Sequence, residues 1–476
     1  MKVYQQQLKN GLSVILVDTQ AFPTLTTLLL VGAGSRYETK ENNGVAHFFE
    51  HMAFKGSKKY PDTYTISSII EGIGGVFNAF TSKDHTGYWI KSTAEHFETV
   101  VDVLADMIKN PLLKEEEIER EKGVIVEEIN LYEDTPYRKV ADYFEELLYQ
   151  DNPLGFDIAG TKKTVKSFTR KTFVDYISRL YHPKNAVLVV AGGLAAEFKK
   201  ARYRVSRLRG TPLQNQRLLK SSKQVSSPSS VLSSRFFAQT STSQNFFASY
   251  YLDIIEEKFA GWKNGEKAGF IPVAENQKQP QIFVKTKKTE QAHFCLGYRA
   301  FSFFDERRHP LSVLAAILGG GMSSRLFIEV RERRGLCYYI STSRELYHDC
   351  GNIVTQAGVT VNLEKVKEAV EVILKEHQKI AEGQIKKEEV RKAKELLKGR
   401  LLLSLEDSQN VATFFGTKKL LQEKIETPEE TVEAIEKVKE EEIVALAKEI
   451  FVPSRLNFAL IGPFEKEQIT TDIFSA

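Results

Sequence analysis

The chain of 476 residues contains an internal repeat, and this repeat constrains the fold more than any other feature. Residues 115–129 match residues 387–401 at an offset of 272, and both blocks have the apolar spacing of a helix. Residues 173–192 match residues 443–462 in the same way, each with a helix, a proline and a β-rich strand that ends in glycine. The repeat therefore predicts two units of one fold in tandem.

Composition agrees with two ordinary α/β domains. Apolar residues make up 42% of the chain and charged residues 27%, which excludes a disordered or fibrous protein. The three cysteines, Cys295, Cys337 and Cys350, are too few for a disulfide framework and favour a reducing compartment. No stretch approaches the roughly 18 apolar residues of a membrane span, and we find no signal or transit peptide. We therefore expect a cytoplasmic protein without a membrane partner.

The repeat also predicts the domain boundaries. The first domain is expected over residues 1–260, a linker over 261–272 and the second domain over 273–476. Each unit then has the length of one α/β domain.

One segment does not belong to the repeat. Residues 198–252 contain ten Lys or Arg and no Asp or Glu, although the whole chain carries 62 acids, and residues 221–244 contain ten serines. This composition predicts a basic, Ser-rich insertion over about residues 196–249 without regular structure. We favour a solvated loop. The alternatives are a tether for nucleic acid or a membrane surface, which would act through residues 199–235, and an artefact of gene prediction.

The sequence His-Phe-Phe-Glu-His at residues 47–51 has the residue types and spacing of a metal site. On a helix over residues 45–54, apolar residues at 45, 48, 49 and 52 form one face, and His47, Glu50 and His51 lie on the other. Two imidazoles one turn apart can bind one zinc ion, and a carboxylate between them can hold the attacking water. The alternative, a pair of surface histidines, is disfavoured by the apolar face.

A zinc site needs a third protein ligand, and the acid-rich helix over residues 115–132 can supply it. Its apolar residues 124–126 predict that this helix enters a core. Glu121 and Glu128 are two turns apart and share a stripe with Val124, whereas Glu127 points about 100° away and is expected in solvent. The second repeat has Arg400 in place of Glu128 and no counterpart of the His-x-x-Glu-His motif, so only the first repeat is expected to be catalytic.

Several further motifs accompany this one. They are HFFEHMAFKG at 47–56, GGVFNAFTS at 74–82, ERE at 119–121, VIVEEI at 124–129, PLG at 153–155, GGGMSSRLF at 319–327 and RERRGLCY at 331–338. Together they resemble the pitrilysin/insulinase family of zinc metallopeptidases, which carry an inverted zinc motif, and within it the bacterial two-domain branch similar to the processing peptidase β subunit. The resemblance covers about residues 1–195 and 250–465.

The resemblance implies a fold class and a set of roles. The fold is α+β, with two homologous α/β domains that each contain a mixed, mostly antiparallel sheet covered by helices. His47, His51 and Glu128 would bind one Zn²⁺ per chain, Glu50 would activate the zinc-bound water, and Glu121 would orient a ligand histidine.

The resemblance further implies a substrate strand and an oxyanion donor. Asn78, Ala79 and Phe80 lie in the family's edge strand, which pairs with the substrate backbone. The glycines Gly319, Gly320 and Gly321 fall in a flexible segment that contacts substrate. Arg331 and Tyr338 match an Arg/Tyr pair of the second repeat, in which Tyr338 would hydrogen-bond the developing oxyanion. A core aromatic is the alternative for Tyr338.

These expectations define a zinc-dependent endopeptidase that hydrolyses extended peptides or unfolded segments. The alternative of a catalytically silent subunit of the same fold, within a processing complex, is disfavoured by the intact zinc motif. We expect a homodimer with shared active sites, or alternatively a heterodimer with an inactive homologue, because the family's four-domain members close a chamber between two halves. Nucleic acid is not an expected partner.

Overall fold

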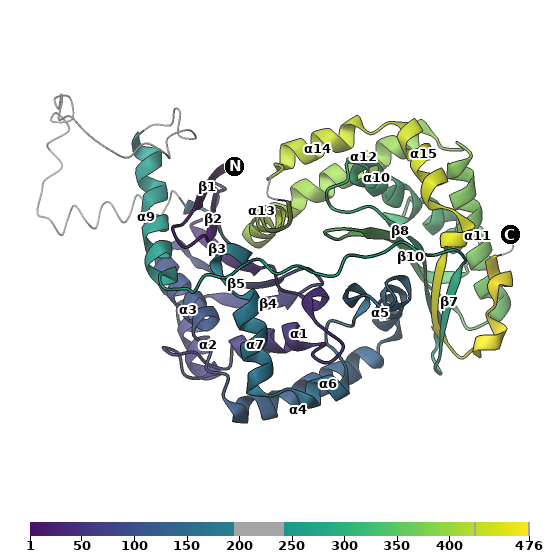
Figure 1. Cartoon of the computed structure of the whole chain (residues 1–476). Coiled ribbons are helices and arrows are strands. Elements are labelled where there is room, and N and C mark those ends of the chain that lie inside the picture. The colour runs from purple at the N-terminus through teal and green to yellow at the C-terminus, as the bar shows by residue number, and fades with distance from the viewer. Residues whose placement is uncertain (195–241, 423–424, 475–476) are drawn as a thin grey trace, which may run out of the picture.

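The computed structural model describes residues 1–194, 242–422 and 425–474. Within these residues the chain forms two mixed β-sheets, each covered by helices, one built from each half of the sequence (Figure 1). This confirms the predicted fold class. Within the same ranges, no helix combines the length and apolar character needed to cross a membrane.

The first sheet has the strand order β1-β2-β6-β3-β5-β4. Its strands are β1 (Lys2–Gln7), β2 (Ser13–Asp18), β3 (Thr24–Val31), β4 (Val76–Thr81), β5 (Thr86–Thr93) and β6 (Ala186–Gly192). Only β2 and β6 pair in parallel, and β4 is an edge strand. The helices of this half are α1 (Val45–Ala53), α2 (Thr63–Gly72), α3 (Phe97–Lys109), α4 (Glu115–Glu133), α5 (Pro136–Leu148), α6 (Lys162–Ser167), α7 (Arg170–Leu180) and α9 (Thr242–Phe259).

The second sheet has the order β7-β11-β8-β10-β9 and repeats the pattern, with one parallel pair, β7 and β11, and with β9 at the edge. Its strands are β7 (Gln281–Thr286), β8 (Gln291–Ala300), β9 (Cys337–Leu346), β10 (Gly351–Thr360) and β11 (Asn457–Gly462). Its helices are α10 (Arg308–Gly319), α11 (Leu363–Ala381), α12 (Lys387–Ser404), α13 (Ser408–Gln422), α14 (Pro428–Lys437) and α15 (Glu440–Ile450). The matched blocks of the sequence are thus α4 with α12, and α7–β6 with α15–β11.

Each half lends one helix to the sheet of the other half. Helix α5 packs Val140 and Phe144 against the second sheet, where they form a cluster with Ala459 of β11. Helix α13 packs Phe415 against the first sheet, together with Val189 of β6. A cut at the predicted linker would therefore leave each sheet without one of its covering helices, an exchange that the repeat did not reveal.

The end of the predicted insertion is wrong. Residues 242–249 form the first turns of α9, and apolar residues at 248, 251, 255 and 259 bury one face of this helix in the first core beside α3. That helical spacing decides the structure, even though the acid-free composition continues to residue 252. The remainder of the predicted insertion, residues 196–241, lies outside the described residues.

A buried guanidinium ties the two halves together. Arg36, whose side chain is fully buried, donates to Asp84 at 2.8 Å and to Asp349 of the second half at 2.7 Å. The guanidinium carbon of Arg36 lies 3.7 Å from the ring centroid of Phe270. Phe270 belongs to the segment 261–280, which has neither helix nor strand. Two carboxylates and one aromatic face from three separate parts of the chain therefore converge on one charge.

We expect Arg36→Met to lower the free energy of unfolding by about 3–5 kcal/mol, because it leaves Asp84 buried without its cation. Lys91→Met is the matched control, since Lys91 and Asp407 also join the halves at 2.9 Å but their side chains are partly exposed, at 31% and 47%. That control should cost about 1 kcal/mol at most. Urea titration of both variants measures the difference, and equal losses would contradict the role of the buried charge.

Candidate metal centre

A buried carboxylate fixes the start of helix α1. Glu38 accepts hydrogen bonds from the backbone N–H of Gly44 and Ala46, both at 2.8 Å, and from the Asn43 amide at 2.9 Å. These bonds satisfy N–H groups that a helix start otherwise leaves open. Burial raises the pKa of Glu38 to about 8, although these hydrogen bonds lower it. Gly44 has φ 98°, and a Cβ there would lie 2.7 Å from the carbonyl oxygen of Ala159, so only glycine fits.

The apolar face of α1 is buried as predicted. Phe48 packs edge-on against Phe173 of α7, and Phe49 packs edge-on against Tyr181. Helix α1 ends at Ala53, so that Phe54 caps it. Because one face is held by the core, the opposite face must point toward α4 and β4.

Three predicted ligands converge between α1 and α4. Glu128 Oε2 lies 3.6 Å from His47 Nε2 and 3.5 Å from His51 Nε2. A tetrahedral zinc ion with bonds of about 2.1 Å places its ligand atoms about 3.4 Å apart. The two imidazoles and the carboxylate therefore fit one zinc ion, and they form the one such group of His, Cys, Asp or Glu side chains within the described residues.

Glu121 positions His51. Its Oε1 lies 2.8 Å from His51 Nδ1, and its Oε2 lies 2.6 Å from the Lys55 ammonium. The hydrogen bond to Nδ1 turns Nε2 toward Glu128, as an outer partner of a ligand histidine does. Burial opposes charge on both groups and is the largest single influence on each pKa. The hydrogen bond between them and the neighbouring opposite charges together exceed it, so the pKa of His51 is raised and, with the help of Lys55, the pKa of Glu121 is lowered.

The register of α4 separates the two adjacent glutamates. Glu128 is partly buried and accepts a hydrogen bond from Tyr132, whereas Glu127 is exposed and accepts a hydrogen bond from Asn130. The helix enters the core as predicted, but of the apolar residues 124–126 it is Ile125 that is fully buried, whereas Val124 is 49% exposed. The core stripe of α4 consists of Ile118, Ile125 and Ile129, and Val124 shares the outward stripe with Glu128.

Glu50 lies beside the ligands in a cavity of about 330 Å³ lined by α1, α4, α5 and β4. Its carboxylate accepts a hydrogen bond from the Thr81 hydroxyl. Burial raises the pKa of Glu50 above its ordinary value despite this bond. Burial and the neighbouring His51 lower the pKa of His47 to about 4, which keeps that imidazole neutral and able to bind a metal.

The predicted substrate strand occupies the edge of the first sheet. Asn78 and Ala79 lie on β4, whose one strand partner among the described residues is β5, so its other edge is open to a further strand. The Ala79 N–H donates to the side-chain oxygen of Asn78 at 2.8 Å. Thr81, which lies on the same strand, faces Glu50 of α1. The ring of Phe80 instead packs in the cluster that contains α13, so that only its backbone can meet a peptide at this edge.

The second half contributes none of the residues that line this cavity. Arg331, in the π-helical turn η5 (Phe327–Glu332), lies with its guanidinium carbon 5.9 Å from the ring centroid of Tyr338 on β9. Tyr338 is 74% exposed, so the alternative of a core aromatic is wrong. Gly319 is buried against β9, where a Cβ would lie 2.2 Å from the Thr342 nitrogen. Substrate contact by Gly319, Gly320 and Gly321 stays a prediction.

Some residues that line the cavity were not predicted from the sequence. Tyr132 follows Glu128 by one helical turn, so its contact could have been found from spacing. Thr81 lies in the quoted edge-strand motif, yet its bond to Glu50 depends on the approach of β4 to α1. Arg138, Asp142 and Asp157 also line the cavity, and no local pattern marks them.

Comparisons with known proteins agree with this geometry. Residues 13–162 match the profile described as Insulinase (Peptidase family M16), and residues 249–397 match the Peptidase M16 inactive domain. The chain is 31% identical over 456 residues, 96% of this chain and 97% of the relative, to the uncharacterized zinc protease YmxG of Bacillus subtilis (strain 168). An uncharacterized zinc protease of Rickettsia felis is also 31% identical, with 96% of this chain and 97% of the relative covered.

Solved structures share the fold. A protease from Helicobacter pylori superposes with a TM-score of 0.80 at 23% identity, covering 97% of this chain and 100% of that chain. A Pseudomonas fluorescens structure described as a peptidase M16 inactive domain gives 0.78 at 17% identity, with 98% of both chains covered. The duplicated fold and the His47, His51 and Glu128 site define the class of inverted-motif zinc peptidases. The chain belongs to the insulinase family, peptidase family M16.

Replacing Glu128 with Gln should weaken zinc binding strongly, since the amide cannot supply the anionic oxygen shared by both histidines. Glu127→Gln is the matched control on the adjacent position and should keep the metal. Zinc content after dialysis against a weak chelator checks both variants. Metal loss that followed Glu127 would show that the register of α4 is wrong.

Proposed function

We propose that this chain is a zinc-dependent endopeptidase that hydrolyses extended peptides or unfolded segments. One observation carries the proposal: Glu50 lies beside the converging atoms of His47, His51 and Glu128, at an edge strand that can bind a peptide. Three protein ligands leave a fourth position open, as catalytic zinc sites require. The relatives are named as uncharacterized zinc proteases, and these names support the same chemistry.

The residues divide the reaction between them. When bound, zinc would lower the pKa of a coordinated water and polarise the scissile carbonyl. Glu50, held by the Thr81 hydroxyl, would take the proton of the attacking water and pass it to the leaving amine. The peptide would add to β4 as a further strand, with its backbone paired to Asn78 and Ala79.

A catalytically silent subunit of the same fold is the alternative function. A silent subunit would be expected to lack a metal ligand or the general base. His47, Glu50, His51 and Glu128 are all present here. Cytoplasmic location also stays a prediction, supported by the three free thiols of Cys295, Cys337 and Cys350.

Glu50→Gln should retain zinc and lose peptidase activity by at least about a hundredfold, because the amide keeps the shape but cannot accept a proton. A quenched-fluorescence peptide assay and a zinc measurement on the same purified sample check this. Near-wild-type turnover by the zinc-loaded variant would remove Glu50 from the role of base. Inactivity of the wild-type chain with zinc present would favour the silent subunit.

We further propose a homodimer in which Arg331 and Tyr338 of one subunit complete the zinc site of the other. The support is that Tyr338 is 74% exposed and Arg331 is partly exposed, while the residues that line the cavity around His47 all come from the first half. Tyr338 would then donate to the oxyanion. A heterodimer with an inactive homologue is the alternative.

Mixing two inactive variants tests whether each active site is shared between two subunits. After exchange at equal amounts, Glu50→Gln and Tyr338→Phe subunits should recover about a quarter of wild-type activity, because half of the dimers are mixed and each then has one intact site. Differently tagged subunits that copurify demonstrate the exchange. Without recovery despite exchange, or with a monomeric active enzyme, the site is not shared.

A further inference from the structure

Two of the three candidate zinc ligands have an outer hydrogen-bond partner, and both partners come from helix α4. Glu121 bonds to Nδ1 of His51. The hydroxyl of Tyr132 donates a hydrogen bond to Oε1 of Glu128. The third ligand, His47, has no hydrogen-bond partner at Nδ1 within the described residues. The orientation of the ligand carboxylate therefore depends on Tyr132.

The two oxygens of Glu128 have different surroundings. Oε2 lies 3.6 Å from Nε2 of His47 and 3.5 Å from Nε2 of His51. Oε1 is the oxygen that accepts the hydrogen bond from Tyr132. One oxygen thus faces the place where a zinc ion would fit, while the hydroxyl holds the other. This arrangement favours binding through a single oxygen, which leaves the fourth position of a tetrahedral zinc ion open.

The geometry of α4 sets the contact between donor and ligand. Tyr132 follows Glu128 by four residues, so the two side chains are neighbours on one face of the helix. The core stripe of Ile118, Ile125 and Ile129 fixes the rotation of α4 about its axis. Because ligand and donor stand on one anchored helix, their separation does not depend on the position of a loop.

Arg138 of α5 restrains the ring of Tyr132 from the other side. Its guanidinium carbon lies 3.9 Å from the ring centroid, which is the distance of a cation–π contact. Both side chains line the cavity that contains Glu50. The ring is therefore held in the orientation in which its hydroxyl reaches Glu128.

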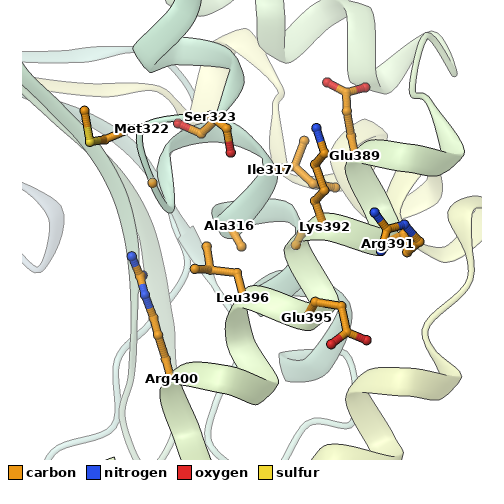
Figure 2. A pocket seen from close by; sticks show the side chains of 13 residues that line it. Ala316, Ile317, Met322, Ser323, Glu389, Arg391, Lys392, Glu395, Leu396 and Arg400 are labelled. Atoms are coloured by element: carbon orange, nitrogen blue, oxygen red, sulfur yellow. The ribbon is translucent and has the colours of Figure 1, made fainter. Parts of the chain in front are cut away.

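The second repeat has neither the ligand nor the tyrosine. Arg400 replaces Glu128, and Ser404 replaces Tyr132. Figure 2 shows Arg400 along one side of a cavity of about 710 Å³ between α10 and α12. The hydroxyl of Ser404 bonds back to the carbonyl oxygen of Leu401 in its own helix at 2.7 Å. Within the repeat, the tyrosine hydroxyl thus occurs together with the carboxylate that it holds.

We propose that Tyr132 is a positioning residue of the metal centre. Its hydroxyl holds Oε1 of Glu128, so that the carboxylate binds zinc through Oε2 alone, and Arg138 holds the ring. Without the hydroxyl the carboxylate could turn and bind with both oxygens, which would occupy the position that the attacking water needs. This inference rests on the proposed peptidase function and adds to it a residue that acts through Glu128.

Tyr132→Phe tests the proposal, because it removes the hydroxyl and keeps the ring beneath Arg138. Zinc affinity, measured by competition with a chromophoric chelator, should fall about tenfold or more, as it does when an outer partner of a ligand is lost. Tyr143→Phe is the matched control. Its hydroxyl bonds at 3.3 Å to Glu133, a glutamate of α4 outside the ligand set, so this variant should keep the zinc affinity of the wild type.

Cobalt(II) in place of zinc reports the coordination directly, since its visible absorption depends on the number and geometry of its ligands. The Tyr132→Phe chain should absorb more weakly than the wild type, because a second carboxylate oxygen adds to the metal. Tyr143→Phe should keep the wild-type spectrum. A purely structural role would lower the affinity and leave the spectrum unchanged.

The outcomes separate this proposal from the proposed function. An unchanged affinity or an unchanged cobalt spectrum in Tyr132→Phe would overturn the positioning role, as would the same changes in Tyr143→Phe. If the wild-type chain itself binds no zinc, the proposed function fails together with the site.

A double-mutant cycle tests the part assigned to Arg138. Arg138→Met is made in the wild type and in the Tyr132→Phe chain, so that the direct repulsion between the guanidinium and the metal cancels in the comparison. If Arg138 acts through the hydroxyl, the substitution should cost about two- to fivefold more zinc affinity in the chain that has Tyr132. Equal effects in the two chains would contradict the role of Arg138.

Discussion

The metal centre depends on how helix α1 is seated. Its apolar face is held by Phe173 and Tyr181, and its start is held by the buried carboxylate of Glu38. With rotation and start both constrained, the opposite face brings His47 and His51 against α4. The bond from Glu121 then sets the ring of His51. The pre-arranged cluster of nitrogens and oxygens follows from ordinary helix packing, not from flexible loops.

Duplication explains the rest of the architecture. Two units of one fold each expose an edge strand beside a pair of helices, and the exchange of α5 and α13 joins them into one body. Arg36 strengthens this union with a buried charge that both halves neutralise. The two equivalent helix pairs then diverged in charge, with Glu128 in one and Arg400 in the other. One scaffold thus carries a candidate metal site in its first half and a cation at the equivalent helix position of its second half.

Local pattern predicted most of the elements and the pairing of His47 with His51, whereas Glu128 was assigned as the third candidate ligand from the family resemblance. The spacing of apolar residues around His47 required a two-faced helix, and the separation of Glu121 and Glu128 by two turns placed both on one side of α4. Prediction failed where a residue's surroundings came from elsewhere in the chain. Val124 is apolar, as core residues usually are, but it is 49% exposed. Residues 242–249 have the composition of the insertion, yet they begin α9, whose apolar face packs in the first core.

The sequence by itself determined the duplication, the α+β class and the two-faced helix that carries His47 and His51, because helical periodicity and residue spacing are properties of contiguous residues. Only the tertiary structure decided which long-range groups meet. The bond of Thr81 to Glu50, the convergence of Asp84, Asp349 and Phe270 on Arg36, and the helix exchange all join segments far apart in the chain. Such contacts arise from the packing of elements in three dimensions, which no local spacing encodes.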